Sequence, residues 1–394
     1  MRLLLLALGS MFSQTTFVSL GKILPAVLAP VVLIDLDIAP SWFGIYMALV
    51  AGSALVIQVG CGSFIVRYGA LRVSQIALVM TALGLAFAQT GLIPLLVLSA
   101  VITGGIAFST PASSHLLGRY APQKWAPLIF SIKQTSVPAG ILIGGLLGPF
   151  LLGLYGWRNT FLIVAASCVI FAAMLEPLRR EFDSDKDLAR KFHFSDFKST
   201  ITLVLGQPEL RSLALACFAF VGLQATFTAY FVIYLTHFGY SLAEAGQIFA
   251  VATSVAMLGR IFWGWLSSSY VSPRLMLAVL ALAMAASVGL TGLFDENWPV
   301  WKITFVSAAV SATVFSWHGV LLAETVRLAP DTMRGAATGG VLSFGQLGGL
   351  TLPLLYSALL WATGSYRVVF IICAVPALSV GLVLLYTARA TKLD

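Results

Sequence analysis

The chain has 394 residues, of which 59% are hydrophobic and only 10% are charged, and its mean hydropathy is +0.96. A soluble domain carries about 25% charged residues, so this composition excludes a water-soluble protein and indicates an integral membrane protein. The net charge of +8 does not indicate a nucleic-acid partner, because the basic residues lie in short segments between apolar runs.

Apolar runs long enough to cross a bilayer follow one another along the chain, since each crossing needs about 20 residues. The first run is expected to stay in place as a spanning helix, because no small-residue cleavage site follows it. The sequence therefore predicts an all-α membrane protein with twelve transmembrane helices. The predicted spans are 3–33, 42–66, 73–89, 95–117, 128–158, 160–175, 211–235, 243–267, 275–293, 300–323, 335–360 and 368–386.

A polar connection separates the two sets of six spans. We therefore expect an N-terminal six-helix bundle at 1–176, a cytoplasmic linker at 177–208 and a C-terminal six-helix bundle at 209–394. The linker contains apolar residues spaced as in an amphipathic helix that lies on the membrane surface. These residues are Phe192, Phe194, Phe197 and Ile201.

Lysine and arginine are distributed unevenly between the two sides of the predicted membrane. If the N-terminus is cytoplasmic, 17 of the 23 basic residues lie in inner loops and tails. Only Arg158, Lys302 and Arg367 lie in outer loops. This bias predicts a multi-pass protein of the bacterial inner membrane with both termini in the cytoplasm.

The two halves of the sequence repeat one another. Two parallel copies of a six-helix unit, joined by a polar linker, are typical of secondary transporters. The matching segments are GSFIVRYGALR (62–72) with GWLSSSYVSPR (264–274), LLGRYAP (116–122) with TVRLAP (325–330), GWRNTFLIVA (156–165) with SYRVVFIICA (365–374), and SQTTF (13–17) with LQATF (223–227).

Three cations fall inside predicted spans: Lys22, Lys133 and Arg260. A charged side chain at the centre of a bilayer costs about 2.5–3.5 kcal/mol on the insertion scale, so each is a candidate functional group. No aspartate or glutamate lies in the middle of a predicted span, so an anionic ligand would neutralise the positive charge. The alternative for each cation is a structural side chain that reaches the interface.

The span at 128–158 combines the sequence Lys133-Gln134 with glycines at 140, 144, 145, 148 and 153. Small residues at such spacing let another helix approach closely, which is general to helix packing in membranes. The lysine and the glutamine are not needed for packing, so they are the part of this span that indicates a substrate.

The loop at 62–72 resembles the G-x-x-x-D-R-x-G-x-x-R signature of the major facilitator superfamily, and the resemblance extends over essentially the whole chain. Gly62, Arg67, Gly69 and Arg72 stand at the signature positions, which implies a role in the cytoplasmic gate. The acidic position is occupied by Val66, and in the second copy of the loop by Ser268. Both copies therefore lack the aspartate that helps to lock the cytoplasmic side in the family.

The segment AMLGRIFWG around Arg260 is similar to helix 8 of oxalate and monocarboxylate transporters, and Lys22 is similar to the helix 1 lysine of monocarboxylate transporters. The aspartate found four residues before that arginine is replaced here by Ala256. The resemblance implies a monomeric carrier of a small organic anion, with protons or a counter-anion as the coupled partner. In the expected mechanism a carboxylate contacts Lys133 and Arg260 during alternating access.

The resemblance also implies that the first, fourth, seventh and tenth helices line the cavity. An interhelical hydrogen bond is the alternative reading of each polar residue on cavity-facing helices. His318, beside Trp317, is a candidate proton relay, because histidine titrates near neutral pH. The other residues that could complete substrate binding are Gln14, Gln224, Tyr230 and Gln346.

Motifs for hydrolases, metalloproteases and P-loop ATPases are absent from the sequence, so we expect neither an enzyme nor a cofactor. The four cysteines lie in apolar runs without metal-ligand spacing, so no metal is expected. The alternative transporter is a drug or metabolite efflux antiporter, because Gly144-x-x-x-Gly148-Pro149 is similar to part of the antiporter glycine-proline motif. A receptor that transports nothing is a third hypothesis, and it predicts no counterflow of any ligand.

Overall fold

The computed structural model describes residues 2–38, 41–190, 195–295 and 297–390, and within these ranges the chain is helical without a strand. Eleven helical segments among the described residues are long and apolar enough to cross a membrane. One of them, Gln123–Phe182, has 60 residues, which is enough for two crossings. The predicted all-α membrane fold with twelve spans is confirmed.

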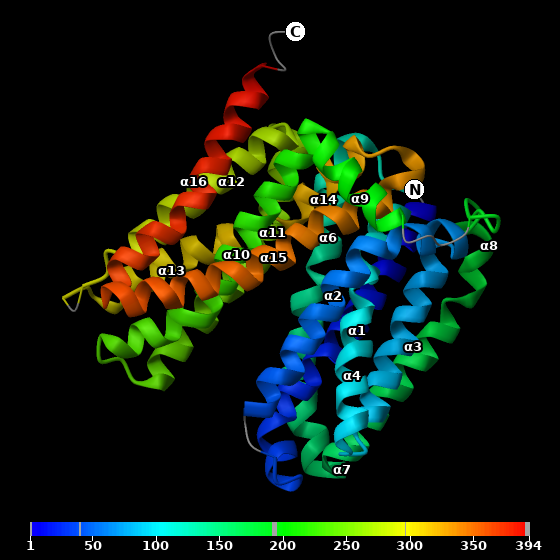
Figure 1. Ribbon diagram of the computed structural model, residues 1–394, viewed down its shortest axis with the longest axis horizontal. Helices are drawn as coiled ribbons and strands as arrows, with labels where there is room; N and C mark the ends of the chain where they lie inside the picture. The colour runs from blue at the N-terminus through cyan, green and yellow to red at the C-terminus, as the bar shows by residue number, and fades with distance from the viewer. Residues whose placement is uncertain (1, 39–40, 191–194, 296, 391–394) are drawn as a thin grey trace. The chain divides into compact units, whose positions relative to one another are not determined.

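The chain forms two compact units. Unit 1 comprises Met1–Ala121, Lys133–Thr202 and Ala329–Gly340. Within it, α1 packs on α7, and α3 packs on both α4 and α7 (Figure 1). The helices of this unit are α1 (Arg2–Asp35), α2 (Ser41–Tyr68), α3 (Ala70–Ala88), α4 (Ile93–Gly105), α5 (Ser109–Tyr120), α7 (Ser136–Met174), α8 (Arg179–Phe182) and most of α9 (Ser195–Gly206).

Unit 2 comprises Pro122–Ile132, Leu203–Leu328 and Val341–Asp394. Within it, α12 packs on α16, and α11 packs on α13. Each unit thus contains a short segment from the other half of the sequence, an exchange that the expected boundaries at 176 and 209 do not include. The helices of this unit are most of α6 (Ala126–Gln134), α10 (Pro208–His237), α11 (Leu242–Ser269), α12 (Pro273–Thr291), α13 (Val300–Val314), α14 (His318–Leu328), most of α15 (Arg334–Thr363) and α16 (Tyr366–Ala390).

Glycines bring α7 against α1 in unit 1. An added Cβ atom at Gly140 would overlap the carbonyl oxygen of Thr16, and one at Gly144 would press on the side chain of Ile23. In contrast, a Cβ atom at Gly145 would meet nothing within 4 Å. The glycines four residues apart therefore form the close contact, because they share one face of the helix.

Helix α7 contains two spans joined by a turn. Gly156 has φ 74° and ψ 166°, a conformation that side-chain-bearing residues rarely adopt, and helical residues lie on both sides of it. The expected boundary between the fifth and sixth spans, at 158–160, falls within a few residues of this turn. Glycine therefore allows the chain to reverse direction with almost no loop.

The spans predicted at 95–117 and 300–323 are present, at Ile93–Tyr120 and Val300–Leu328, but each consists of two α-helices. The first is interrupted by a 3₁₀ turn at Ile106–Phe108, and the second by the non-helical residues between α13 and α14. The two interruptions lie at matching positions of the repeat, and α5 and α14 follow them. Gly104 and Gly105 weaken the helix before the first interruption, and Pro111 is tolerated because it lies in the first turn of α5.

The linker contains helix α9, Ser195–Gly206. Phe192 and Phe194 of the expected amphipathic helix lie outside the described residues. The ring of Phe197 lies so close to Gly60 of α2 that an added Cβ atom there would be 2.7 Å from it. Phe197 therefore packs against the end of a spanning helix within unit 1.

Candidate functional site

Lys133 lies in the last turn of α6 and is buried, with only 1% of its surface exposed. Its Nζ atom donates a hydrogen bond to Oε1 of the neighbouring Gln134 at 3.1 Å. Among the described residues no carboxylate lies within ion-pair distance of Lys133. Burial of an ammonium group beside a neutral amide costs free energy, and a bound negative charge would lower that cost.

The residues before Lys133 in α6 belong to unit 2, where small residues fix their position. Added Cβ atoms at Gly264 of α11 and at Gly319 of α14 would both overlap Ser131. The Leu128 amide donates to Oγ of Ser268 at 3.0 Å. Ser268 stands at the acidic position of the second loop copy, so a hydroxyl there binds α6 directly.

Arg260 of α11 is 7% exposed and lies at the interruption of the tenth span. Its Nε atom donates to the Phe315 carbonyl at 2.8 Å, and Nε1 of Trp263 donates to the Ala312 carbonyl at 2.7 Å. Trp317 donates its own indole hydrogen to the Val314 carbonyl at 2.8 Å. In a continuous helix these carbonyls would accept hydrogen bonds from backbone amides. Here side chains donate to them instead, which explains why α13 ends at this point.

Gln224 of α10 faces the same interruption. Phe220, one turn before it, packs on Trp317 with ring centroids 5.4 Å apart, and Phe227, one turn after it, packs on Phe315 at 6.4 Å. Oε1 of Gln224 is buried without a hydrogen-bond partner among the described residues. Gln224 therefore offers an unused acceptor close to the end of α13.

His318 begins α14 and stacks on Trp317 with ring centroids 3.8 Å apart. Its Nδ1 atom is buried and has no hydrogen-bond partner among the described residues, and His318 follows by three residues Phe315, whose carbonyl accepts from Arg260. Unit 2 therefore brings together three of the predicted site residues: Arg260, His318 and Gln224.

The matching positions in unit 1 form a neutral, satisfied network. Gln14, the repeat counterpart of Gln224, is fully buried, and its Nε2 donates to the Ser74 carbonyl at 3.1 Å. Oε1 of Gln14 accepts a hydrogen bond at 3.0 Å from Ser109, the first residue of α5. The hydrogen-bonding groups of Gln14 are therefore occupied within its own unit.

Of the remaining predicted residues, Tyr230 has a structural contact, and Lys22 and Gln346 differ from Lys133 in burial. The hydroxyl of Tyr230 donates to the Pro353 carbonyl at 3.2 Å, and its ring stacks on Tyr356 at 4.2 Å. Lys22 lies on α1 with an exposed side chain, and Gln346 lies on α15 with a partly buried one. Tyr230 thus has an interhelical role, and Lys22 is not a buried cation of the same kind as Lys133.

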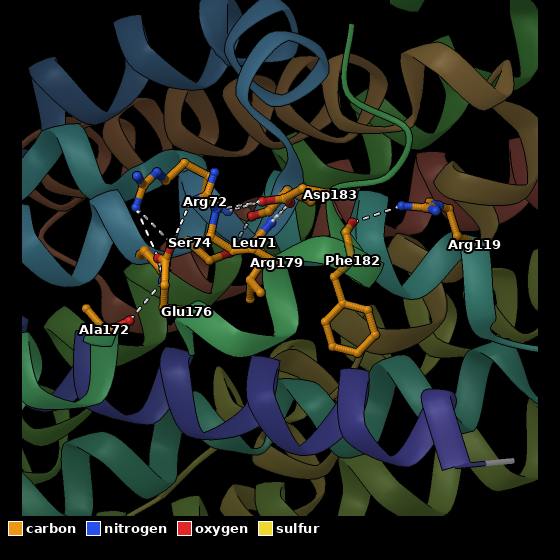
Figure 2. A network of polar contacts seen from close by, with 11 residues as sticks. Leu71, Arg72, Ser74, Arg119, Ala172, Glu176, Arg179, Phe182 and Asp183 are labelled. Carbon is orange, nitrogen blue, oxygen red and sulfur yellow. Dashed lines mark hydrogen bonds and ion pairs between the residues drawn. The ribbon is translucent and has the colours of Figure 1, made fainter. Parts of the chain in front are cut away.

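The loop between α2 and α3 is held by an aspartate of the linker (Figure 2). Gly69 begins α3 with φ 92°, and a Cβ atom there would overlap the carboxylate of Asp183. That carboxylate accepts hydrogen bonds from the amides of Leu71 at 2.7 Å and Arg72 at 3.1 Å. Asp183 is 2% exposed, and burial raises the pKa of its carboxyl, which the two amides and Arg179 only partly offset.

The other signature residues have partners in unit 1 as well. Arg72 pairs with Glu176 at 3.3 Å, as Figure 2 shows, and Arg67 donates to the Arg190 carbonyl at 2.6 Å. The Val66 carbonyl, at the position where the acid is missing, accepts from the Asp187 amide at 2.8 Å. Reasoning from sequence missed the contact of Asp183 with the loop between α2 and α3, although the acid-rich segment EFDSDKD was visible.

A twelve-span helical fold with two repeats and buried cations defines a multi-span membrane transporter. The sequence profile described as the Major Facilitator Superfamily matches residues 4–326. The chain belongs to this superfamily, so it is a secondary transporter and not an enzyme. Among the described residues no group of three or more histidine, cysteine, aspartate or glutamate side chains could hold a metal ion.

Known transporters that resemble this chain have low sequence identity to it, and their names give different substrates. The chain is 22% identical to the sialic acid transporter NanX of Escherichia coli over 60% of its own length and 58% of that protein. It is 24% identical to the multidrug resistance protein MdtG of Proteus mirabilis over 75% of its length and 71% of that protein. The human organic anion transporter MFSD10 (TETRAN) has a similar fold, with a TM-score of 0.73, 17% identity and coverage of 96% of this chain and 98% of that one.

Proposed function

We propose that the protein carries small organic anions, most directly carboxylates, and that Lys133 and Arg260 are its anion-binding cations. The observation that carries the proposal is the buried Lys133, whose described partner is the amide oxygen of Gln134. A carboxylate would supply the missing negative charge and replace a neutral contact with a charge-assisted one. Similarity to a sialic acid transporter supports an acid as substrate.

Arg260, Gln224 and His318 of unit 2 form a second group of proposed substrate-binding residues. The planar guanidinium of Arg260 suits a carboxylate, and its Nε bond to the Phe315 carbonyl orients it. Gln224 and His318 provide buried polar atoms that could bind a substrate hydroxyl or amide. His318 is also the proposed proton relay, if transport is coupled to protons.

The proposed transport cycle follows from the positive charge of the substrate-binding residues. Without substrate, the buried ammonium of Lys133 is bonded to the neutral amide of Gln134, and an anion would supply the opposite charge. The carrier with bound anion would then expose its binding site to the other side of the membrane. Proton symport or exchange against a second anion would supply the driving force. The proposed location is the bacterial inner membrane with both termini in the cytoplasm.

The experiment measures carboxylate uptake into proteoliposomes for wild type, Lys133→Ala and Arg260→Ala. We expect each substitution to lower the initial rate at least about 100-fold, because a buried charge partner is worth several kcal/mol. Candidate substrates come first from a thermal-shift screen of organic acids on the purified protein.

Two control variants separate binding from folding. Lys22→Ala removes an exposed cation of the same type and should keep most of the uptake. Trp263→Phe removes a helix-end hydrogen bond next to Arg260 without a change of charge, so it should lower thermal stability more than uptake. Normal uptake by both Lys133→Ala and Arg260→Ala would overturn the proposal.

The second candidate function is efflux of drugs, and the similarity to MdtG favours it. Efflux of cationic drugs would require a negative group in the membrane, whereas Lys133 and Arg260 are positive and the buried Glu324 of α14 is paired with Arg327. Binding of a cationic dye in preference to an organic acid, measured on the purified protein, would favour this candidate over the anion carrier.

A further inference from the structure

The end of α7 borders a basic hollow that the proposed transport function does not use. This hollow in unit 1 has a volume of about 650 Å³. It is lined by Ala173, Glu176, Pro177, Arg179, Arg180 and Lys186. Three cations and one carboxylate thus surround a space large enough for a polar group.

The charges of the hollow are not balanced. Glu176 is paired with Arg72 and Arg179, and Arg179 also lies 3.5 Å from the carboxylate of Asp183 (Figure 2). Arg180 and Lys186 are exposed and form no ion pair among the described residues. These two cations leave the hollow with an excess of positive charge that attracts an anion.

The wall of the hollow continues as an apolar surface on α7. Ala173, which lines the hollow, lies on the same helical face as Ile170, which is 61% exposed. Val169 and Met174 beside them are 49% and 66% exposed. In a spanning helix, such a face contacts lipid acyl chains, so the hollow lies where the apolar run meets the polar surface.

We propose that this hollow binds the headgroup of an anionic phospholipid, with Arg180 and Lys186 on the phosphate and the acyl chains along Ile170 and Met174. A phosphate suits the arginine fork and the lysine ammonium, and the apolar face accounts for the rest of the molecule. Basic residues at a membrane surface contribute about 1 kcal/mol each to the binding of anionic lipid. Free inorganic phosphate shares the headgroup chemistry but does not use the apolar face.

The test titrates the full-length protein in mild detergent with phosphatidylglycerol or phosphatidylcholine and measures the lipid-bound fraction by native mass spectrometry. Wild type should prefer phosphatidylglycerol. The double variant R180Q/K186Q should bind it about 30-fold more weakly, as two lost cations predict. Ala173→Phe keeps the charges but fills the wall of the hollow, and should also weaken binding.

The matched control is K198Q/R211Q, which removes two exposed cations outside the hollow and should leave the preference unchanged. Equal weakening in both double variants would show non-specific attraction and overturn the assignment. Wild-type affinity in R180Q/K186Q would do the same. Displacement of phosphatidylglycerol by inorganic phosphate at equal concentration would identify a free-anion site and likewise overturn the lipid proposal.

Discussion

Single linker residues bind the start of α3. Val66 occupies the acidic position of the loop, and the carboxylate that accepts from the first amides of α3 belongs to Asp183 of the linker. Amide N–H groups at a helix N-terminus have no partner within the helix, and they attract negative charge. An acid from elsewhere in the chain can therefore serve the same helix end.

Asp185 is the second linker acid with a defined site. It accepts hydrogen bonds from His115 at 2.7 Å and from Arg119 at 2.6 Å. Burial raises the pKa of its carboxyl, but the bond from His115 and the charges of His115 and Arg119 outweigh this effect, so the pKa lies below its usual range. The ionised form of Asp185 therefore stabilises the folded protein.

The first prediction concerns Asp185→Asn and its dependence on pH. A lowered pKa in the folded state contributes stability above the unfolded pKa of about 3.9, and that stability is lost as the pH falls through the lower folded value. At pH 7 the variant should lose about 1 kcal/mol, since the pair is partly exposed. The difference in unfolding midpoint between wild type and variant should shrink below about pH 4.

The matched control is Asp187→Asn, whose carboxylate accepts a hydrogen bond from the nearby Ala189 amide on the exposed linker. It should change the midpoint of thermal unfolding much less. A difference for Asp185→Asn that grows as the solution is acidified would contradict the assignment of the His115 and Arg119 contacts.

At the scale of elements, the position of each helix follows from where small residues occur on its surface. Gly140 and Gly144 bring α7 against α1, and Ser131 brings α6 against Gly264 and Gly319. Helices in membranes gain little from burying apolar side chains, because lipid is equally apolar, so close packing of small residues decides their contacts. These contacts set the position of the α6 residues that precede Lys133.

The second prediction compares Gly140→Ala with Gly145→Ala, two glycines of the same helix. The first places a methyl group against the Thr16 carbonyl and should destabilise the protein by about 1–3 kcal/mol through overpacking. The second meets nothing within 4 Å and should be neutral or slightly stabilising. Thermal unfolding of both variants in detergent checks this, and equal midpoints would contradict the described α1–α7 contact.

At the scale of the whole molecule, the two repeats have similar helices but different chemistry at matching positions. Gln14 is hydrogen-bonded to Ser74 and Ser109 in unit 1, whereas its counterpart Gln224 in unit 2 keeps a buried oxygen without a described partner. Each half of the sequence also lends a short segment to the unit formed mainly by the other half. A cut in the linker would therefore separate each of these segments from the unit to which it belongs.

The third prediction concerns a chain divided between Gln207 and Pro208. Residues 1–207 lack the segment 329–340 of unit 1, and residues 208–394 lack the segment 122–132 of unit 2. We expect each half expressed alone to be degraded, and the two halves expressed together to accumulate and copurify through a tag on one of them. Stable, well-folded accumulation of either half alone would contradict the exchange of segments.

The sequence by itself determined the membrane class, the number of spans and the repeat, because composition and hydrophobic length are local properties that survive in any arrangement of the helices. It also singled out Lys22, Lys133 and Arg260, since a cation in an apolar run stands out without any structure. Only the tertiary structure decided which polar atoms are already satisfied. It assigned Gln14 and Tyr230 to interhelical bonds, interrupted the tenth span where side chains bind its carbonyls, and brought Asp183 to α3, because such contacts join residues far apart in sequence and leave no local pattern.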